Sequence, residues 1–185
     1  MAAIDAQRMS TPRLDLLPLQ VAHATEMASV LADPVLHDFI GGAPLGPAEL
    51  RARYQRLVAG SADPAVSWCN WVILLRGEGC LTGTVQATIS AGGVSGEGSV
   101  SGEGGEAEIA WVVGTPWQGQ GIATEAARGL VGWLWRQHVA VITACIHPDH
   151  GASAAVAAAA GLQPTDHWSD GEVVWRREAP AGRRA

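Results

Sequence analysis

The chain has 185 residues, a net charge of −6 and 48% hydrophobic residues. This size suits one well-packed domain, and the acidic balance argues against nucleic acid as the main partner. No apolar run approaches the roughly 20 residues that a membrane span needs, and the first residues lack the apolar core of a secretory signal.

The three cysteines, Cys69, Cys80 and Cys145, are an odd number without metal-ligand spacing. This usage is typical of reduced thiols in a cytoplasmic protein. We therefore expect no metal site, no membrane association and a cytoplasmic location.

Hydrophobic periodicity and turn residues divide the chain into strands and helices. Strands are expected at residues 13–19, 67–76, 80–90, 107–114, 139–147, 162–168 and 172–177, and helices at 21–34, 46–60, 122–137 and 150–161. Residues 35–45, which include Gly41, Gly42 and Pro44, are expected to form a loop. Because strands alternate with helices only in the second half, the order predicts an α/β (α+β) fold with a mixed sheet of about six to seven strands and helices on both faces.

We expect a single domain over residues 1–185 with disordered ends at residues 1–10 and 178–185. The segment 91–106 is rich in glycine, serine and glutamate. Such a segment cannot bury enough apolar surface to offset its ordering entropy, so we expect a mobile loop there.

The stretch TPWQGQGIATEA, residues 115–126, lies between an expected strand and an expected helix. Gly119 and Gly121 let the backbone approach a ligand without interference from a Cβ atom. The first turn of the helix presents unpaired N–H groups and a partial positive charge, which favour an anion such as a diphosphate. The loop is weak evidence by itself, because many glycine loops are only turns and this one contains no lysine or arginine.

Two common nucleotide-binding patterns do not fit this loop. The dinucleotide pattern G-x-G-x-x-G fails because Thr124 stands three positions after Gly121. The P-loop pattern requires a lysine, and the chain has none.

The loop matches Gln/Arg-x-x-Gly-x-Gly/Ala as Gln118-x-x-Gly121-x-Ala123, which resembles the acetyl-CoA pyrophosphate motif of the GNAT N-acetyltransferase superfamily. AEIAWVVGTPWQGQGIATEAARGLVGWLW is similar to the strand–loop–helix core of that family, and IHPDHGASAAVAAAAGL resembles its next motif. TPRLDLLPL and the tryptophan-containing strand look like the branch that acetylates N-terminal alanines of ribosomal proteins and varied small amines. The resemblance runs from about Thr11 to Arg177.

The resemblance implies a GNAT fold with a V-shaped splay between the parallel strands 107–113 and 139–147. The pantetheine arm of acetyl-CoA would lie in the V, with its pyrophosphate on the glycine loop. The implied cofactor-binding residues are Val112, Val113, Gln118, Gly119, Gln120, Gly121, Ile122, Ala123, Thr124, His150 and Ser153. Arg128 is a further candidate, for which a surface role is the favoured interpretation.

The second motif departs from the family pattern in two ways, at His150 and in the absence of a tyrosine. His150 stands where the family usually has an Asn that contacts the pantetheine arm. Many relatives use a tyrosine in this second motif to protonate the departing thiolate, but the only tyrosine here, Tyr54, lies in a different helix. Ser153 is therefore the candidate acid, and the alternative is a small polar residue in a first helical turn.

The resemblance implies direct attack of an amine on the thioester in a ternary complex, so a base must take a proton from the amine. In the family, an acidic residue on the strand before the pyrophosphate loop often serves as this base. Glu108 holds that position, and Glu106 is the neighbouring candidate. The alternative is that Glu108 is only a solvated glutamate at the end of a strand. A backbone N–H of Val112 or Val113 would stabilise the oxyanion.

Between Arg76 and Arg128 the chain has no basic residue and several glutamates, which favours a cationic acceptor such as an N-terminus, a polyamine or an amino sugar. Trp68 or Trp71 could stack on the acceptor, although core packing is expected for at least one of them. A homodimer is permitted. Open alternatives are another acyl donor, an antibiotic acceptor, a non-catalytic acyl-CoA-binding or sensor module, and a nucleotide-diphosphate binder.

Overall fold

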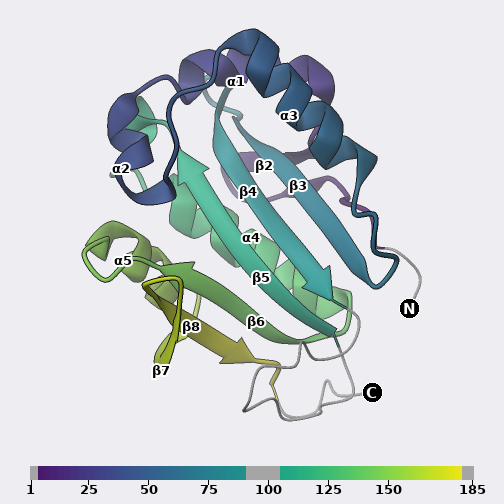
Figure 1. Ribbon diagram of the computed structural model, residues 1–185, viewed down its shortest axis with the longest axis vertical. Helices are drawn as coiled ribbons and strands as arrows, with labels where there is room; N and C mark the ends of the chain where they lie inside the picture. The colour runs from purple at the N-terminus through teal and green to yellow at the C-terminus, as the bar shows by residue number, and fades with distance from the viewer. Residues whose placement is uncertain (1–3, 91–104, 181–185) are drawn as a thin grey trace.

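The computed structural model describes residues 4–90 and 105–180, which form one open sheet with helices on both faces (Figure 1). The eight strands are β1 (Met9–Ser10), β2 (Leu14–Pro18), β3 (Val66–Leu75), β4 (Cys80–Ser90), β5 (Gly105–Val113), β6 (Val139–Ile146), β7 (Gln163–Ser169) and β8 (Glu172–Glu178). The helices are α1 (Ala24–Val30), α2 (His37–Ile40), α3 (Pro47–Ala59), α4 (Ile122–Arg136) and α5 (Gly151–Ala159), with 3-10 turns η1 (Val21–His23), η2 (Pro34–Leu36) and η3 (Thr115–Trp117).

The strand order is β1-β2-β3-β4-β5-β6-β8-β7. Neighbouring strands are antiparallel except for β5 and β6, which α4 joins as a parallel pair. The predicted mixed sheet and the predicted parallel pair are confirmed. The sheet has eight strands rather than six to seven, because the two-residue strand β1 adds to the seven expected ones.

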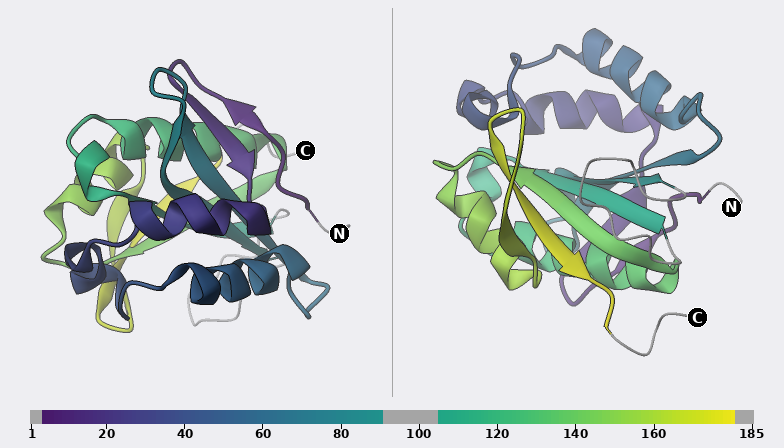
Figure 2. Two further views of the ribbon diagram at one scale, coloured as in Figure 1. Left: turned by 90° about the horizontal axis from the view of Figure 1, so that it is seen from above. Right: turned by 60° about the horizontal axis from the view of Figure 1, so that its bottom comes forward.

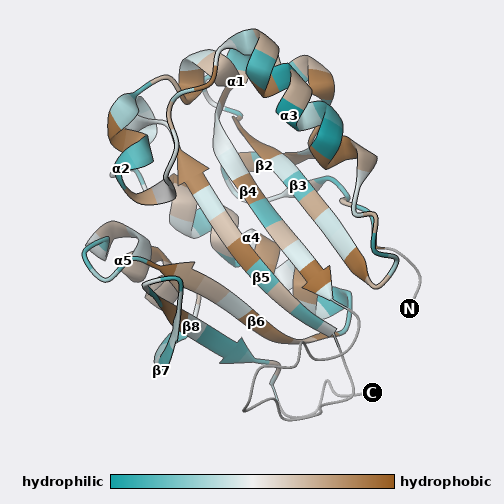
Figure 3. Ribbon diagram, viewed as in Figure 1, coloured by the Kyte–Doolittle hydropathy of each residue, from teal (hydrophilic) through white to brown (hydrophobic). Residues whose placement is uncertain are grey.

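Two hydrophobic layers hold the helices against the sheet. On one face, α4 and α5 pack on a core that includes Trp71, Ile73 and Ile109. On the other face, α1 and α3 pack on a smaller core that includes Leu50 and Val72 (Figure 2). Hydrophilic and hydrophobic residues alternate along parts of the central strands (Figure 3), because successive residues of a strand face opposite sides of the sheet. None of the helices in the described ranges is long and apolar enough to cross a membrane.

Two local predictions were wrong. Residues 4–10 are ordered, because Trp71 Nε1 donates to Gln7 O at 2.7 Å and Cys69 Sγ contacts Ile4 O at 3.2 Å. Within the expected loop 35–45, η2 and α2 form a short helical segment that Pro34 begins and Asp33 caps at Val35 N, 3.0 Å. The segments η2 and α2 have only three and four residues, which is too short for a hydrophobic period to appear in the sequence.

The ends and the glycine-rich segment are described only in part. Strand β8 continues to Glu178, so the predicted disorder is wrong at that residue. The predicted mobile loop 91–106 lies mostly outside the described residues, while Gly105 and Glu106 belong to β5.

A buried carboxylate fixes the N-terminal edge of the sheet. Asp15 is 4% exposed and accepts hydrogen bonds from Ser10 Oγ at 2.6 Å, Arg8 at 2.8 Å and Arg76 at 3.0 Å. The Ser10 hydrogen bond is the largest cause that lowers the pKa of Asp15; burial opposes it, and the two arginines add to the lowering. The carboxylate therefore ties β1, β2 and the end of β3 together.

We expect Asp15→Asn to lower the unfolding free energy by about 1–3 kcal/mol, because charged hydrogen bonds are lost at a buried site. Since the folded pKa is lowered, the stabilisation is present above the ordinary aspartate pKa of about 3.9 and is lost as pH falls through the folded value. Urea unfolding at neutral pH and at about pH 3 would show a smaller difference between wild type and variant at the acid pH. The exposed Asp166→Asn is the control, and an equal loss of stability in both variants would contradict this role for Asp15.

Candidate active site

A cavity of about 480 Å³ lies where the two parallel strands separate. Strand β5 pairs with β6 only from Gly105 to Glu108, opposite Val139 to Thr143. Beyond these positions the strands diverge, and the rest of β5 has no partner on that side (Figure 1). The predicted V-shaped splay is therefore present, and its open edge faces the cavity.

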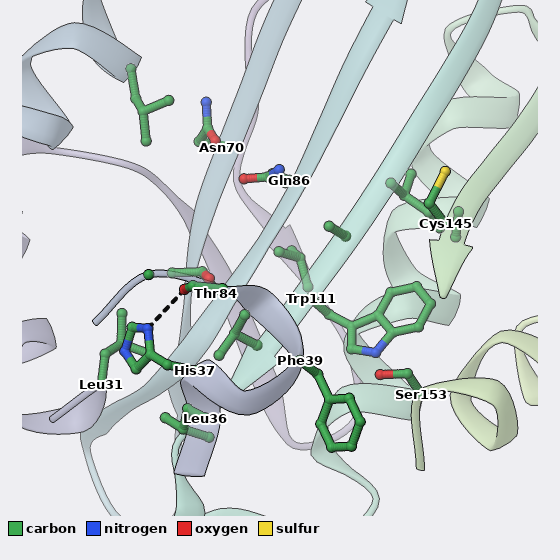
Figure 4. Close-up of a pocket in the computed structure, with 18 of the residues that line it drawn as sticks. Leu31, Leu36, His37, Phe39, Asn70, Thr84, Gln86, Trp111, Cys145 and Ser153 are labelled. Carbon is green, nitrogen blue, oxygen red and sulfur yellow. Dashed lines mark hydrogen bonds between the residues drawn. The ribbon is translucent and has the colours of Figure 1, made fainter. Parts of the chain in front are cut away.

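Residues from both halves of the chain line the cavity. Strand β5 contributes Glu108, Ile109, Ala110, Trp111 and Val112, strand β6 contributes Ala144, Cys145 and Ile146, and α5 contributes Ser153. Figure 4 shows Trp111, Ser153 and Cys145 on one side of the cavity, with Leu31, Leu36 and His37 on the other. The opposite wall comes from the segment around α1, α2 and α3.

Aromatic rings join α2 to the start of α5 across the cavity. The ring of Phe39 stacks on His150 with centroids 4.2 Å apart and an interplanar angle of 4°, and it contacts His147 at 5.5 Å. Burial is the largest cause that lowers the pKa of His150, and the charge of His147 adds to it against Glu172. A neutral imidazole is favoured, which suits a stacked ring at the N-cap of α5.

The glycine loop leads directly into α4. Gly119 has φ of 71° and Gly121 has φ of 75°, a left-handed conformation that strains any other residue. A Cβ at Gly119 would meet no atom within 4 Å, so the concave side of the loop is open. The first amide of α4 that donates to a backbone carbonyl is that of Glu125, which bonds Gly121 O at 3.0 Å.

Among the hydrogen bonds of the described residues, none is donated by the amides of Ile122, Ala123 or Thr124. Unpaired N–H groups at a helix N-terminus form an anion site together with the helix dipole. Loop and helix start therefore fit a diphosphate, as the sequence predicts.

Arg13 supplies the positive charge that the loop sequence lacks. Its Nε donates to Glu125 Oε2 at 2.7 Å, its Nη1 donates to Gln120 O at 3.1 Å, and a Cβ at Gly121 would lie 3.5 Å from its Nη2. Burial would raise the pKa of Glu125, but hydrogen bonds from Thr11 and Arg13 and the charge of Arg13 lower it overall. Sequence reasoning missed Arg13, because 107 positions separate it from Gln120 and no local pattern links them.

At the end of β5, the carbonyl of Val112 points towards β4 and that of Val113 points towards the open edge. Val112 O lies against Gly83 of β4, so close that a Cβ at Gly83 would overlap it. Val113 O instead accepts the side-chain amide of Gln118 at 3.0 Å. Because the N–H and C=O of one extended residue point to the same side, Val113 has its amide at the open edge and Val112 faces β4.

The remaining predicted side chains separate into two groups. Glu108, His150 and Ser153 line the cavity. Arg128 does not, because its Nε donates to Ala159 O at 2.8 Å and joins α4 to α5. Trp71 is fully buried, as expected for a core residue, and Trp68 is 41% exposed outside the cavity walls.

The comparisons with known proteins give one family. The model of the acetyltransferase (GNAT) domain matches residues 13–163, which is more than half of the chain.

The chain belongs to the GNAT acetyltransferase family.

It is therefore an acyltransferase, and the resemblance found in the sequence is confirmed. No curated protein matches the chain in sequence. Among the solved structures, an acetyltransferase from Agrobacterium tumefaciens has a TM-score of 0.69 and 23% identity, covering 97% of this chain and 98% of its own. RimL, a ribosomal L7/L12 α-N-protein acetyltransferase in complex with coenzyme A, has a TM-score of 0.70 and 15% identity, covering 93% and 98%.

An aminoglycoside acetyltransferase in complex with coenzyme A has a TM-score of 0.68 and 18% identity, covering 89% of this chain and 94% of its own. At these identities the structures show the fold alone, and RimL is consistent with the branch that the sequence resembles. Among the described residues, no group of three or more His, Cys, Asp or Glu side chains could hold a metal ion.

We expect Gly121→Glu to weaken CoA binding by about 100-fold or more, because a carboxylate beside the diphosphate adds like-charge repulsion of several kcal/mol. Isothermal titration calorimetry with CoA measures the loss. Gly60→Glu is the matched control, since Gly60 has φ of 81° and a Cβ there would meet no atom within 4 Å. Equal weakening by both variants would show general damage to the fold instead of a loss at the loop.

Gln118→Ala removes only the brace between the loop and Val113 O. We expect a weaker effect on CoA binding, roughly three- to tenfold, which corresponds to one neutral hydrogen bond. The same calorimetric titration ranks the two variants, and a larger loss for Gln118→Ala than for Gly121→Glu would contradict the assignment of the diphosphate to the glycine cradle.

Proposed function

We propose that this GNAT chain transfers an acetyl group from acetyl-CoA to a primary amine, by direct attack in a ternary complex. The observation that carries the proposal is the single cavity at the splay. Along one wall it has the open edge of β5, which leads to the glycine loop, and on the same strand it has the carboxylate of Glu108. Donor and acceptor can therefore meet in one space next to a base.

The residues proposed to hold acetyl-CoA follow the path from the helix start to the splay. Gly119 to Thr124 would bind the diphosphate through backbone N–H groups, with Arg13 beside them. The open edge of β5 beyond its pairing with β6 would hydrogen-bond the pantetheine arm, in the way that an added strand pairs. His150 and Ser153 would line the other side of the arm.

Glu108 is the proposed base. It lies on the exposed side of β5, between Thr88 and Thr143 of the neighbouring strands, and it lines the cavity. The nitrogen of the amine forms a bond to the thioester carbonyl carbon, its surplus proton passes to Glu108 directly or through water, and the carbon–sulfur bond breaks. The N–H of Val113 is the proposed oxyanion donor, because it faces the splay and Val112 does not.

A route through an acetylated cysteine is disfavoured in this cavity. Cys145 is the cysteine on the β6 wall, and burial raises the pKa of its thiol to about 11, with the charges of Glu108, Glu172 and Asp170 adding to the effect. The nucleophile of such a route is the thiolate, which is scarce at neutral pH when the pKa is so high. Direct transfer with Ser153 as the proposed proton donor to the leaving sulfur needs no covalent intermediate.

The charges around the cavity favour a cationic acceptor. Glu108 and Glu172 line the cavity, whereas Glu78 bonds Trp117 at 3.0 Å and Glu125 pairs with Arg13. Among the described residues, the glutamates that line the cavity are therefore Glu108 and Glu172. A homodimer stays a prediction, for which Trp168, 60% exposed, offers an aromatic surface.

A thiol-release assay with acetyl-CoA and a panel of amines tests the proposal. The panel contains a peptide N-terminus, a polyamine, an aminoglycoside and an amine with two carboxylates. Turnover of cationic amines supports the proposal. Binding of CoA without turnover on any amine would instead support a sensor module, faster turnover with succinyl-CoA would indicate a different donor, and preference for the anionic amine would contradict the charge argument.

Glu108→Gln should lower kcat/KM for the best amine by about 100-fold or more, the usual contribution of a general base. CoA affinity should stay unchanged, because Glu108 is not among the residues proposed to hold the coenzyme. Glu106→Gln is the matched control, since Glu106 lies two residues earlier on β5 and does not line the cavity. Equal losses in both variants, or none in Glu108→Gln, would exclude Glu108 as the base.

A further inference from the structure

The part of the cavity under α1, α2 and α3 differs chemically from the splay. Six leucines line it, namely Leu19, Leu31, Leu36, Leu45, Leu50 and Leu57. They come from the end of β2 to the end of α3, with Leu31 and Leu36 beside His37 in Figure 4, while Asn70 of β3 and Thr84 and Gln86 of β4 line the cavity from the sheet. We call this part the leucine chamber. Nothing in the transfer of an acetyl group requires an apolar chamber of this kind.

Two polar atoms at the chamber have no hydrogen-bond partner among the described residues. They are Tyr54 Oη and His37 Nε2, both shielded from solvent, on residues that line the cavity. Tyr54 is only 3% exposed. An unpaired polar atom at a buried position costs free energy, so a group that a ligand brings to it is recognised selectively.

The hydrogen-bonding character of both atoms is defined. His37 Nδ1 lies 3.1 Å from Gly41 O (Figure 4), and because a carbonyl only accepts, Nδ1 is the donor. In the neutral ring Nε2 is then an acceptor. Burial raises the pKa of Tyr54 to about 12 against the opposing charge of Arg53, so its hydroxyl stays protonated and offers a donor as well as lone pairs.

We propose that the leucine chamber binds the body of the acceptor, and that this body is an apolar side chain next to one neutral hydrogen-bonding group, an amide or a hydroxyl, which Tyr54 and His37 recognise. An amide or hydroxyl both donates and accepts, so it suits either atom. The proposal rests on the proposed amine acetylation, and it narrows the acceptor to a monoamine such as the first residue of a peptide.

The same chamber disfavours polycations. A second ammonium among the leucines would be buried without a counter-charge, at a high desolvation cost. Arg53 also lines the cavity and repels a further positive charge. Polyamines and amino sugars carry several ammonium groups, so they fit the chamber worse than a peptide-like monoamine with a single ammonium near Glu108.

Two variants test the polar contacts. Tyr54→Phe removes Oη and keeps the ring, and His37→Asn keeps a donor for Gly41 O while it removes Nε2. The acceptors are leucinamide and 3-methylbutylamine, which lacks the carboxamide. We expect each variant to raise KM for leucinamide by about three- to tenfold, the value of one hydrogen bond, and to leave KM for 3-methylbutylamine unchanged. Because each amine is compared between variant and wild type, the ratio of the two KM values does not depend on the different basicity of the amines.

Thermal unfolding without ligand gives a readout independent of turnover. Tyr54→Phe should leave Tm unchanged or raise it, because no protein hydrogen bond is lost. A clear fall in Tm would mean that Oη already has a partner and would overturn the proposal, as would equal KM changes for both amines or a preference of the wild type for spermidine over leucinamide.

Binding of leucinamide in the presence of CoA, measured by calorimetry, separates this proposal from the proposed function. If wild type binds leucinamide more tightly than Tyr54→Phe but acetylates no amine, the proposed role of the leucine chamber is supported and the proposed acetylation is wrong. If amines are acetylated and leucinamide binds both proteins equally, the acetylation stands and the chamber assignment is wrong.

Discussion

The separation of β5 from β6 is the constraint on which the site depends. Two parallel strands normally pair along their length, and here the pairing ends at Glu108 and Thr143. The unpaired edge of β5 leaves backbone groups that a ligand can satisfy, in place of the sheet partner that they lack. The same divergence places Glu108 at the last paired position, where its side chain meets the cavity, and brings Trp111 to the wall opposite α2. Binding edge, base and cavity thus arise from one interruption of the sheet.

The N-terminal edge of the sheet supports the other end of the site. The turn between β1 and β2 brings Thr11 and Arg13 onto Glu125 in the first turn of α4, with hydrogen bonds of 2.6 and 2.7 Å. Asp15 holds that turn through Arg76, whose guanidinium also bonds the carbonyls of Thr11 and Pro12. The position of the glycine loop therefore depends on a chain of charged contacts that begins at a buried carboxylate. Glu125 pairs with Arg13, so the backbone amides of the loop are the main anion ligands that we propose.

Local patterns made the fold and the loop predictable. Hydrophobic alternation gave β3 to β6 within about two residues, and the Gln118-x-x-Gly121-x-Ala123 spacing identified the helix entrance whose open N–H groups the structure shows. Three features depend on contacts between distant residues and could not be read from any window: Arg13 at the loop, Phe39 stacked on His150, and Tyr54 facing the same cavity as Glu108. The choice of Val113 over Val112 at the open edge depends on the register of β4 against β5, which the alternation of side chains leaves undetermined.

The proposed donor side of the cavity consists mainly of backbone groups, and the proposed acceptor side consists mainly of side chains. The proposed donor side uses backbone N–H groups, glycine conformations and a helix end, which many sequences can supply. Structures only 15–23% identical share the fold over most of the chain. Of these, one is named for a ribosomal protein and another for an aminoglycoside, so the shared scaffold carries little information about the acceptor. That information must lie in side chains of the variable wall. In this chain the wall consists of α1 to α3, where leucines surround two buried polar atoms, and its chemistry is that of a neutral body attached to a single amine.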